Sequence, residues 1–420
     1  MLSYLLAYNR YLNIVGIIAI LSIAWIFSRA RFSIDLRQIA SAFILQVATA
    51  YIILKTHIGM WIVSKIAQGA TALYGYTGVG IKFLFGTLSD ESNAWGFIFA
   101  FKVLPIMVFF GALTAVLFHL RIIQTVVGIL SAIVRPLLGT TGAETLCAVA
   151  NGFLGQTESP LLVRNYLSSM TRSEMMVVMV SGMATVSGAI VTSFAFMGVP
   201  LEHLLTSCIM SVPGSILIAK ILCPETERRV ASTKKVLPVE SSSDNIFGAI
   251  AKGTLDGLQL ALNVGAMLIS FLGLLALCNG ALSLLCSLGV NYRLLPASWL
   301  GHCSIQSIIG VFARPFAYVL GLQGQEQVVA AQLIGTKVAI NELMAYIDML
   351  SSNVLSSRTI AILTYALCGF SNFSCIGIQI GGIGALVPER RHLITQFGLY
   401  AVLGGTLTNL LNACIVSLFI

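Results

Sequence analysis

Charged side chains are scarce in this sequence. Of its 420 residues, 10% are Asp, Glu, Lys or Arg, whereas 57% are hydrophobic. A soluble globular chain carries about 25% charged residues, so the polar surface that an ordinary soluble enzyme needs is missing. Apolar runs of about 20 residues, the length of a spanning helix, recur and do not alternate with polar residues. We therefore expect an all-α polytopic membrane protein.

Cysteine pairs at metal-binding spacing are also missing. The nine cysteines form no Cys-x-x-Cys motif and no Cys/His cluster, and most lie inside apolar runs. These are Cys147, Cys208, Cys278, Cys368 and Cys414. The pattern favours structural thiols over disulfides or a metal site. The net charge of +8 is dispersed among loops, which favours a positive-inside distribution over a nucleic-acid-binding patch. No small-residue cleavage site follows residues 11–28, so we expect a retained span there and not a signal peptide.

The apolar runs predict eight spanning helices. They cover residues 11–28, 38–54, 95–118, 175–197, 203–222, 258–285, 360–386 and 396–419. Residues 140–168 and 305–350 are apolar but interrupted, and we expect re-entrant hairpins. Residues 55–92 mix apolar and charged side chains, which indicates an interfacial helix plus loop, and residues 121–138 are predicted to form a second interfacial helix.

Basic residues predict the orientation in the membrane. They lie in four loops, as Arg29, Arg31 and Arg37, then Arg121, then Arg228, Arg229, Lys234 and Lys235, and finally Arg390 and Arg391. All four loops fall on one face if each hairpin enters and leaves on the same side, and both termini then lie outside. Ten full spans would scatter these loops over both faces.

The order of the elements suggests an internal repeat. Each interrupted region precedes a span that polar residues interrupt, and then a further span. The two hairpins would enter from opposite faces. Many secondary transporters share this inverted-repeat plan, with discontinuous helices that meet near the midplane of the membrane.

The stretch NGFLGQTESP, residues 151–160, is the first of four polar clusters. Such residues persist at membrane depth only against protein or a cavity. Gly155 permits a tight hairpin tip. Gln156, Thr157 and Glu158 offer an amide, a hydroxyl and a carboxylate, which together can recognise a neutral molecule rich in donors and acceptors. The alternative is an ordinary exposed turn.

Small and hydroxylated residues dominate the second cluster, SGMATVSGAIVTS, residues 181–193. Small residues let transmembrane helices pack closely. Alternatively, the helix is locally unwound, and its carbonyls and the Thr185 hydroxyl bind a cation. The sequence alone leaves both interpretations open.

The third cluster is GTKVAINELMAY, residues 335–346. Lys337 and Asn341 are four residues apart and are expected to share a helix face. Glu342 would then be free to accept two hydroxyls of a ligand, as from a sugar diol. The alternative is a Lys–carboxylate pair that stabilises the helix bundle.

The fourth cluster, CGFSNFSCIGIQIGGIG, spans residues 368–384. Asn372 interrupts a span beside Phe370, whose ring can stack on a flat base. The glycines indicate helix packing or a helix break, because a nucleotide fingerprint would follow a strand.

Taken together, GQTESP, GTKVAINELMAY and CGFSNFSCIGIQIGG resemble the bacterial-type concentrative nucleoside transporters. The hallmark of that family is G-x-K-x-x-x-N-E-F-V-A-[YFM]. It is matched here by Gly335, Lys337, Asn341, Glu342, Ala345 and Tyr346, and Leu343 and Met344 depart from it, apolar for apolar. The resemblance covers nearly the whole chain. It implies a homotrimer whose protomers have eight spans, interfacial helices and two opposed hairpins, and a transport part that moves like an elevator against a scaffold.

The resemblance also implies a division of the chain. Residues 1–120 would belong to the scaffold, residues 121–222 would hold the first hairpin repeat, and residues 223–257 would form a cytoplasmic loop and interfacial segment. Residues 258–300 would form a scaffold span, and residues 301–420 the second hairpin repeat with the last span.

Site residues follow from the same resemblance. Gln156, Thr157 and Glu158 would contact the nucleobase, Glu342 and Asn372 the ribose hydroxyls, Phe370 the bound nucleoside and Ile190 an apolar part of it. Cys375 stands where many relatives have a serine that touches the ribose, and a thiol is a weaker hydrogen-bond partner. Sodium would be held by the side chains of Asn151 and Thr185 and by carbonyls near Leu154, Val186 and Ala189.

We therefore expect a secondary active importer of nucleosides of the uridine, cytidine and adenosine class in the cytoplasmic (inner) membrane. Its partners would be nucleosides, membrane lipid and further copies of itself, without nucleic acid or a cofactor beyond the coupling ion. Sodium is the expected ion, and a proton carried on Glu158 or Glu342 is the alternative, for nucleosides or nucleobases. An enzyme that uses these carboxylates as an acid/base pair would need a nucleophile, metal or cofactor motif that the sequence does not offer.

Overall fold

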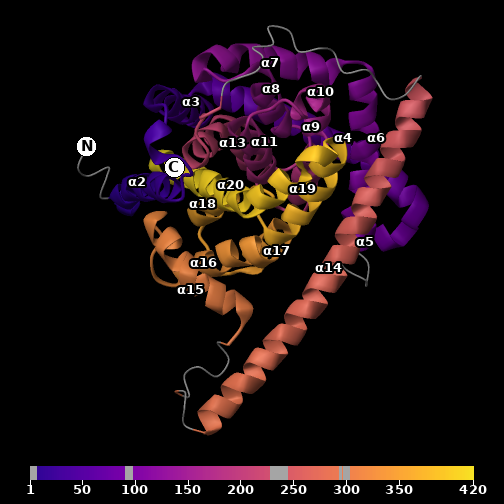
Figure 1. The fold of residues 1–420 in the computed structure, drawn as a ribbon. Coiled ribbons are helices and arrows are strands. Elements are labelled where there is room, and N and C mark those ends of the chain that lie inside the picture. Colours follow the sequence, from indigo (N-terminus) through magenta and orange to yellow (C-terminus); the bar gives the residue numbers. More distant parts are fainter. Residues whose placement is uncertain (1–6, 90–97, 228–244, 293–295, 297–302) are drawn as a thin grey trace.

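The computed structural model describes residues 7–89, 98–227, 245–292, 296 and 303–420. All regular structure in these ranges is helical (Figure 1), which confirms the all-α prediction. The basic residues between 228 and 244 lie outside the described ranges.

Among the described residues up to 222, the chain forms twelve α-helices. They are α2 Arg10–Ile26, α3 Leu36–Lys55, α4 His57–Phe85, α5 Phe99–Lys102, α6 Leu104–His119, α7 Ile122–Leu138, α8 Gly142–Asn151, α9 Ser159–Leu162, α10 Arg164–Leu167, α11 Arg172–Ala184, α12 Gly188–Phe196 and α13 Leu201–Leu222. The second half forms α14 Ile246–Asn291, α15 Ile305–Val319, α16 Gly324–Ala339, α17 Glu342–Ser351, α18 Ser357–Leu367, α19 Phe373–Leu386 and α20 Arg391–Phe419.

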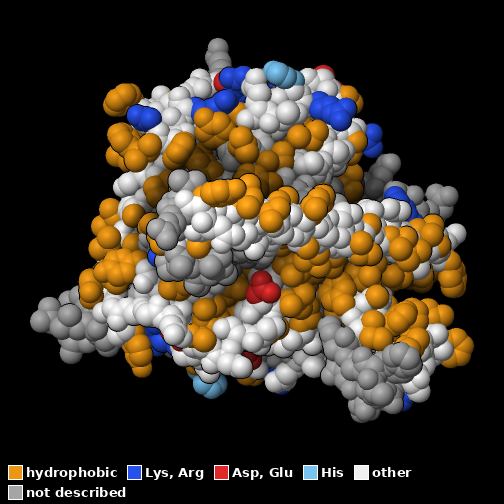
Figure 2. Space-filling model, turned by 90° about the horizontal axis from the view of Figure 1, so that it is seen from below, with side chains coloured by type: hydrophobic (Ala, Val, Ile, Leu, Met, Phe, Trp, Pro, Cys, Tyr) orange, Lys and Arg blue, Asp and Glu red, His pale blue; other side chains and the backbone are white. Residues whose placement is uncertain are grey.

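Six helical stretches in the described residues are long and apolar enough to cross a bilayer. They are Leu36–Lys55, Phe99–His119, Arg172–Phe196, Leu201–Leu222, Ile246–Asn291 and Pro388–Phe419. The other two predicted spans fall on α2, which is 17 residues long, and on the broken pair α18 and α19. Hydrophobic side chains cover much of the face seen in Figure 2, with Lys and Arg near its edges, as expected for a protein embedded in lipid.

Two helices are longer than the sequence suggested. Helix α4 is continuous over 29 residues where we expected an interfacial helix plus a loop. Helix α14 has 46 residues, not the span 258–285, and at 1.5 Å per residue it is about 69 Å long. It contains no proline, and residues 257–292 carry no charge, so nothing in the sequence ends the helix where the bilayer would.

The predicted inverted repeat is present. The first hairpin is α8 with α9 and α10, and it precedes the broken helix α11–α12 and then α13. The second hairpin is α16 with α17, and it precedes the broken helix α18–α19 and then α20. The breaks lie at residues 185–187 and 368–372. The ambiguity of the second polar cluster is thus resolved in favour of local unwinding.

A buried ion pair fixes the base of the first hairpin. The Lys220 ammonium near the end of α13 lies 2.7 Å from a carboxylate oxygen of Glu144, and both side chains are almost fully buried. The other Glu144 oxygen accepts the Thr141 backbone N–H at 2.7 Å, which completes a capping box at the start of α8. Lys220 also donates to Ser173 on α11 at 3.1 Å. One cation therefore connects three elements of the repeat.

Helices α2 and α3 pack against the repeat, although the sequence-based division places them with the scaffold. Helix α2 contacts α20, and α3 contacts α13. Gln46 of α3 donates to Asn412 of α20 at 2.6 Å, and Asn412 donates to Ser211 of α13 at 2.9 Å. All three side chains are buried. Helix α3 therefore contacts helices far away in the sequence as well as its neighbour α4.

Helices α6 and α14 pack along each other beside the two repeats (Figure 1). We call this pair of helices the rib. Glycines bring their backbones together at Gly111, Gly253 and Gly257. A Cβ on Gly257 would lie 2.6 Å from the Met107 carbonyl oxygen, and one on Gly253 would lie 2.5 Å from the Gly111 carbonyl oxygen. Small residues at such spacing allow the close approach of transmembrane helices.

We expect Gly257→Val to loosen this rib. The added side chain has no room between the two backbones, and overpacking of this kind costs about 1–3 kcal/mol. The midpoint of thermal unfolding in detergent should therefore fall. Gly280→Val is the matched control, because Gly280 lies on the same helix with nothing within 4 Å of its Cβ position. Equal midpoints for the two variants would contradict the packing argument.

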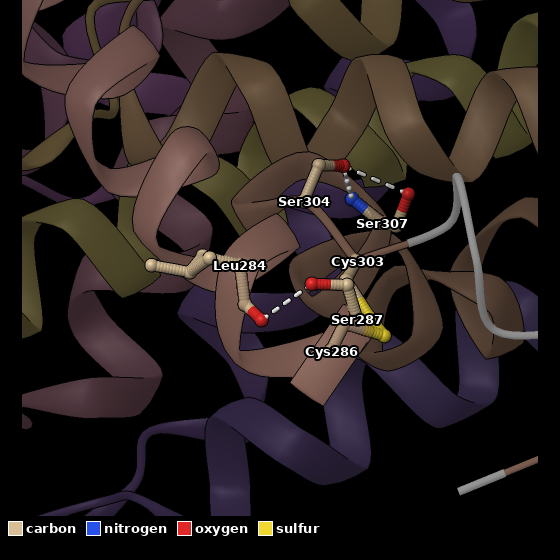
Figure 3. Close-up of a disulfide and its surroundings, with 6 residues drawn as sticks. All are labelled: Leu284, Cys286, Ser287, Cys303, Ser304 and Ser307. Carbon is tan, nitrogen blue, oxygen red and sulfur yellow. Dashed lines mark hydrogen bonds between the residues drawn. A yellow bond between two sulfur atoms is a disulfide. The ribbon is translucent and has the colours of Figure 1, made fainter. Parts of the chain in front are cut away.

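The structure contains a disulfide between Cys286 and Cys303 (Figure 3). The expectation that the cysteines are structural thiols is wrong for this pair. The seven other cysteines are free thiols, and six of them are buried. The two bonded residues lie 17 positions apart at either end of a connection between helices, a spacing that matches no short cysteine motif.

Candidate functional site

A cavity of about 640 Å³ lies between the first hairpin, the start of α17, the two helix breaks and the first half of α14. This size is typical of a site for a small molecule. All eight residues predicted to contact the substrate line it. They are Gln156, Thr157, Glu158, Ile190, Glu342, Phe370, Asn372 and Cys375. Polar clusters from both repeats, which are far apart in the sequence, therefore meet at one cavity.

Three helix N-termini border this cavity. The N-cap residues Ser187 of α12, Asn341 of α17 and Asn372 of α19 all line it. The first N–H groups of a helix have no partner within the helix, and they carry partial positive charge. Breaks in the spans thus place backbone donors where only hydrocarbon side chains would otherwise be found.

Glu342 and Asn372 are joined to each other. The Asn372 amide donates to a Glu342 carboxylate oxygen at 3.1 Å, and both residues are buried. The Asn372 oxygen accepts from the Cys375 backbone N–H at 2.9 Å and from the Ser374 hydroxyl at 2.7 Å. The amide is thereby oriented, and the remaining lone pairs of Glu342 can accept hydroxyls of a ligand.

The spacing of Lys337 and Asn341 predicted that they share a helix face, and this prediction is wrong. Helix α16 ends at Ala339, and Asn341 instead caps α17 by accepting the Met344 N–H at 2.9 Å. The buried Lys337 ammonium donates to the Asn409 side-chain oxygen at 2.7 Å and to the Ala366 carbonyl at 3.4 Å. Within the described ranges it forms no salt bridge to a carboxylate, so the alternative of a Lys–carboxylate pair is wrong there.

Asn409 of α20 ties the two helix breaks together. Its amide nitrogen donates to the Ala184 carbonyl at 2.8 Å and to the Cys368 carbonyl at 2.7 Å. Ala184 is the last residue of α11 and Cys368 is the C-cap of α18, and a helix end leaves such carbonyls without intrahelical partners. Phe370 adds a backbone bond from its N–H to the Thr185 carbonyl at 3.3 Å. These bonds join the two helix breaks where the repeats cross.

The tip of the first hairpin lies against two glycines. A Cβ on Gly182 of α11 would lie 2.9 Å from the Cβ of Gln156, and one on Gly382 of α19 would lie 2.9 Å from a methyl carbon of Thr157. Gln156 is buried, and its side-chain oxygen has no hydrogen-bond partner among the described residues. Thr157 and Glu158 are exposed and face the cavity. The predicted hairpin tip is thus present, and it presents its polar side chains to the site.

The residues predicted to hold sodium surround the first break. Asn151, Leu154, Thr185 and Val186 are buried, and Ala189 lies in the first turn of α12. The Ser181 hydroxyl donates to Val178, so the Asn151 amide nitrogen must face Ser181, which it approaches to 2.9 Å. This leaves the buried Asn151 oxygen without a hydrogen-bond partner in the described chain. A buried oxygen acceptor without a partner suits a hard cation such as sodium.

Sequence reasoning missed a polar stripe on α14. Asp256, Gln259 and Asn263 line the same cavity from the side of the rib. They are spaced by three and four residues, which places them on one helix face. That periodicity within an apolar helix was the available signal, because polar residues at membrane depth usually face a cavity.

A second cavity of about 390 Å³ adjoins the first and shares Glu158 and Asp256 with it. It runs between the rib and the first hairpin, and His119 and Lys252 also line it. These residues lie near the ends of α6 and α14 that border the basic loops. The two cavities together lie between the rib and the repeats.

Family models match almost the whole chain. The N-terminal model of the Na+ dependent nucleoside transporters matches residues 15–88, and the C-terminal model matches residues 203–417. A nucleoside recognition model, the gate, matches residues 100–201 between them. The chain belongs to the family of Na+-dependent, concentrative nucleoside transporters. It is therefore a member of a membrane transporter family and not of an enzyme family.

Relatives from this family align over nearly the full length. An uncharacterized transporter of Haemophilus influenzae is 42% identical over 97% of both chains. The nucleoside permease NupC of Helicobacter pylori is 38% identical over 98% of both chains. The human solute carrier family 28 member 3 is 31% identical, and the match covers 98% of this chain and 60% of that protein.

Solved structures of the transporter CNTnw share the fold. Its inward-facing substrate-bound state gives a TM-score of 0.89 at 36% identity, with 97% of both chains covered. A variant of it in an outward-facing state gives 0.88 over 98% of this chain. The same fold has therefore been solved in inward-facing and outward-facing states, which is consistent with an elevator-type transporter.

Proposed function

We propose that this protein is a secondary active importer that couples nucleoside uptake to sodium. The observation that carries the proposal is the Glu342–Asn372 pair at 3.1 Å. It places a carboxylate and an oriented amide opposite the amide, hydroxyl and carboxylate of the first hairpin, across one cavity. A ribose diol would bind at the first pair and a nucleobase edge at the second.

The remaining contacts divide between base and sugar. Phe370 offers an aromatic face to the base, and Ile190 an apolar surface. The Cys375 thiol lies beside the ribose position, where it is a weaker partner than a hydroxyl. Asp256, Gln259 and Asn263 would complete the site from the rib.

Sodium would act through the first hairpin. Asn151 ends α8, and Leu154 leads into the tip that carries Gln156. A cation held by the Asn151 oxygen, the Thr185 hydroxyl and the nearby carbonyls would order that tip and so form the base-binding side. Each ligand would then strengthen binding of the other by the same factor.

The packing supports a division into two bodies. We assign α6 and α14 to a static rib, and both repeats together with α2 and α3 to the moving body. The apolar side chains exposed along α14, among them Leu262, Ile269 and Leu277, suit contact with lipid and with two further copies in a homotrimer. The four basic loops would face the cytoplasm, in the inner membrane of a bacterium, with both termini outside.

Uptake into proteoliposomes tests the proposal, with sodium and proton gradients imposed separately. Uridine and adenosine should accumulate with the sodium gradient alone. Their 2′-deoxy counterparts should compete about 5- to 150-fold less well, because the buried Glu342–Asn372 site loses about 1–3 kcal/mol per unmade hydrogen bond. Uptake driven only by a proton gradient would contradict sodium coupling and would identify the coupling ion as a proton carried on a carboxylate. Equal competition by ribose and deoxyribose nucleosides would contradict the assignment of the ribose site.

A further inference from the structure

The disulfide lies where α14 passes into α15. Cys286 is five residues before the end of α14, and Cys303 is two residues before the start of α15. Their Cα atoms are 6.4 Å apart, within the range that a disulfide bridges. Asn279 of α14 adds two bonds to the start of α15, because its amide nitrogen donates to Gln306 at 3.0 Å and its oxygen accepts the Ile305 N–H at 2.9 Å.

Local hydrogen bonds hold the start of α15 at this position. The Ser304 side chain accepts the Ser307 N–H at 3.1 Å and caps the helix. Figure 3 shows this cap beside the bonded cysteines. The cap, the Asn279 contacts and the disulfide therefore act on the same few residues.

Charge places this junction on the face opposite the basic loops. Helix α14 begins directly after the segment that holds Arg228, Arg229, Lys234 and Lys235. After Asp256, near the start of the helix, no charged residue follows until Arg293, so residues 257–292 cross the apolar layer. With positive charges inside, Cys286 and Cys303 lie outside the cytoplasm. Disulfides form and persist in that oxidising compartment, so charge and the cysteine pair indicate the same topology.

The disulfide also joins the two bodies. Helix α14 packs along α6, whereas α15 packs against α16 and α2. A Cβ on Gly16 of α2 would lie 3.0 Å from the Val319 carbonyl at the end of α15, so α15 is closely seated on the repeats. The disulfide is thus a covalent link between the rib and the start of α15, in addition to the backbone that joins the rib to the repeats elsewhere.

We propose that Cys286 and Cys303 are an extracytoplasmic oxidation site whose disulfide is the fixed pivot between the rib and α15. The two thiols lose two protons and two electrons. One thiolate attacks the disulfide of a thiol–disulfide oxidoreductase, and the other then displaces it, so the oxidoreductase leaves as a dithiol. The existence of the disulfide is independent of what the protein transports. Its role as a pivot rests on the proposed function and its two bodies.

Thiol counting tests the bond itself. Purified protein is denatured with and without reductant and labelled with a polyethylene glycol maleimide, which adds one mass step per thiol. The wild type should show seven steps without reductant and nine with it, since seven of its nine cysteines are free. Cys286→Ser should show eight in both lanes. Cys278→Ser, the control on the same helix, should still gain two steps on reduction. Nine steps in the unreduced wild type would overturn the disulfide.

The side of the membrane is tested in intact cells. A membrane-impermeant phosphine should release the two thiols without lysis, and a strain without its periplasmic thiol oxidase should yield them already reduced. Release that requires lysis would place the junction in the cytoplasm and overturn the topology.

The pivot is tested with the Cys286→Ser/Cys303→Ser double variant in proteoliposomes. Its uptake rate and thermal midpoint should both fall while the nucleoside Kd is unchanged. The nearest cavity residue on α14, Leu268, lies about 27 Å along the helix from Cys286. Cys278→Ser should behave as wild type. An unchanged rate and midpoint would overturn the pivot, whereas absent uptake in every protein, with the thiol counts as expected, would contradict only the proposed transport.

Discussion

Replacing Glu342 with Gln is expected to abolish nucleoside uptake and to leave the protein folded. The carboxylate is buried beside Asn372, and it would accept two ribose hydroxyls. Hydrogen bonds to a charged group contribute about 1.5–3 kcal/mol each. Losing two of them should weaken binding by at least about 100-fold. The amide keeps the shape of the side chain, so the packing of α17 should not change.

The measurement is nucleoside Kd and uptake for Glu342→Gln beside Glu389→Gln. Glu389 is an exposed carboxylate near the start of α20, and its amide variant should match the wild type in both. Size-exclusion profile and thermal midpoint establish that both proteins fold. Full uptake by the Glu342 variant would refute the ribose assignment.

The largest stability change is expected from Lys220→Met. Lys220 and Glu144 form a 2.7 Å pair with side chains 2% and 0% exposed. Removing one partner of a buried pair leaves the other charge uncompensated, which typically costs about 3–5 kcal/mol. The base of the first hairpin should lose its anchor, and the thermal midpoint in detergent should fall sharply.

The double variant Lys220→Met/Glu144→Gln separates this charge effect from lost packing. It removes both charges, and it should recover much of the stability that the single variant loses, because the remaining groups can be accommodated without an isolated buried charge. If the double variant is as unstable as the sum of the two single variants, the ion pair is not what holds the hairpin base.

Much of the local structure follows from the sequence. Thr141 with Glu144, and Thr171 with Glu174, are capping boxes that can be recognised from their spacing, and they begin α8 and α11. Polar residues inside apolar runs identified both hairpins and both broken spans. The resemblance to the nucleoside transporters also identified eight side chains that prove to share one cavity.

Other features depend on contacts that no local pattern encodes. The partners of Lys337 lie on other helices, so its spacing from Asn341 indicated the wrong contact. The contacts of α3 with α13 and α20 depend on single buried amides. Cys286 lies one residue beyond the predicted end of its span, and it meets Cys303 through a pairing that no cysteine motif indicates. Asp256 contributes to the site only because the rib lies against the hairpin tip.

The bonds of Asn409 bear on how such a protein could open. Its amide nitrogen donates to the carbonyls at the ends of α11 and α18, and its oxygen accepts a hydrogen bond from the buried Lys337 ammonium. The two unwound segments cannot slide past each other without breaking these bonds, and no water is available there to replace them. The region where the two helix breaks cross should therefore move as a rigid body. Access to a bound solute would change through displacement of that rigid body along the rib and through movement of the hairpin tips, while the crossing itself keeps its shape.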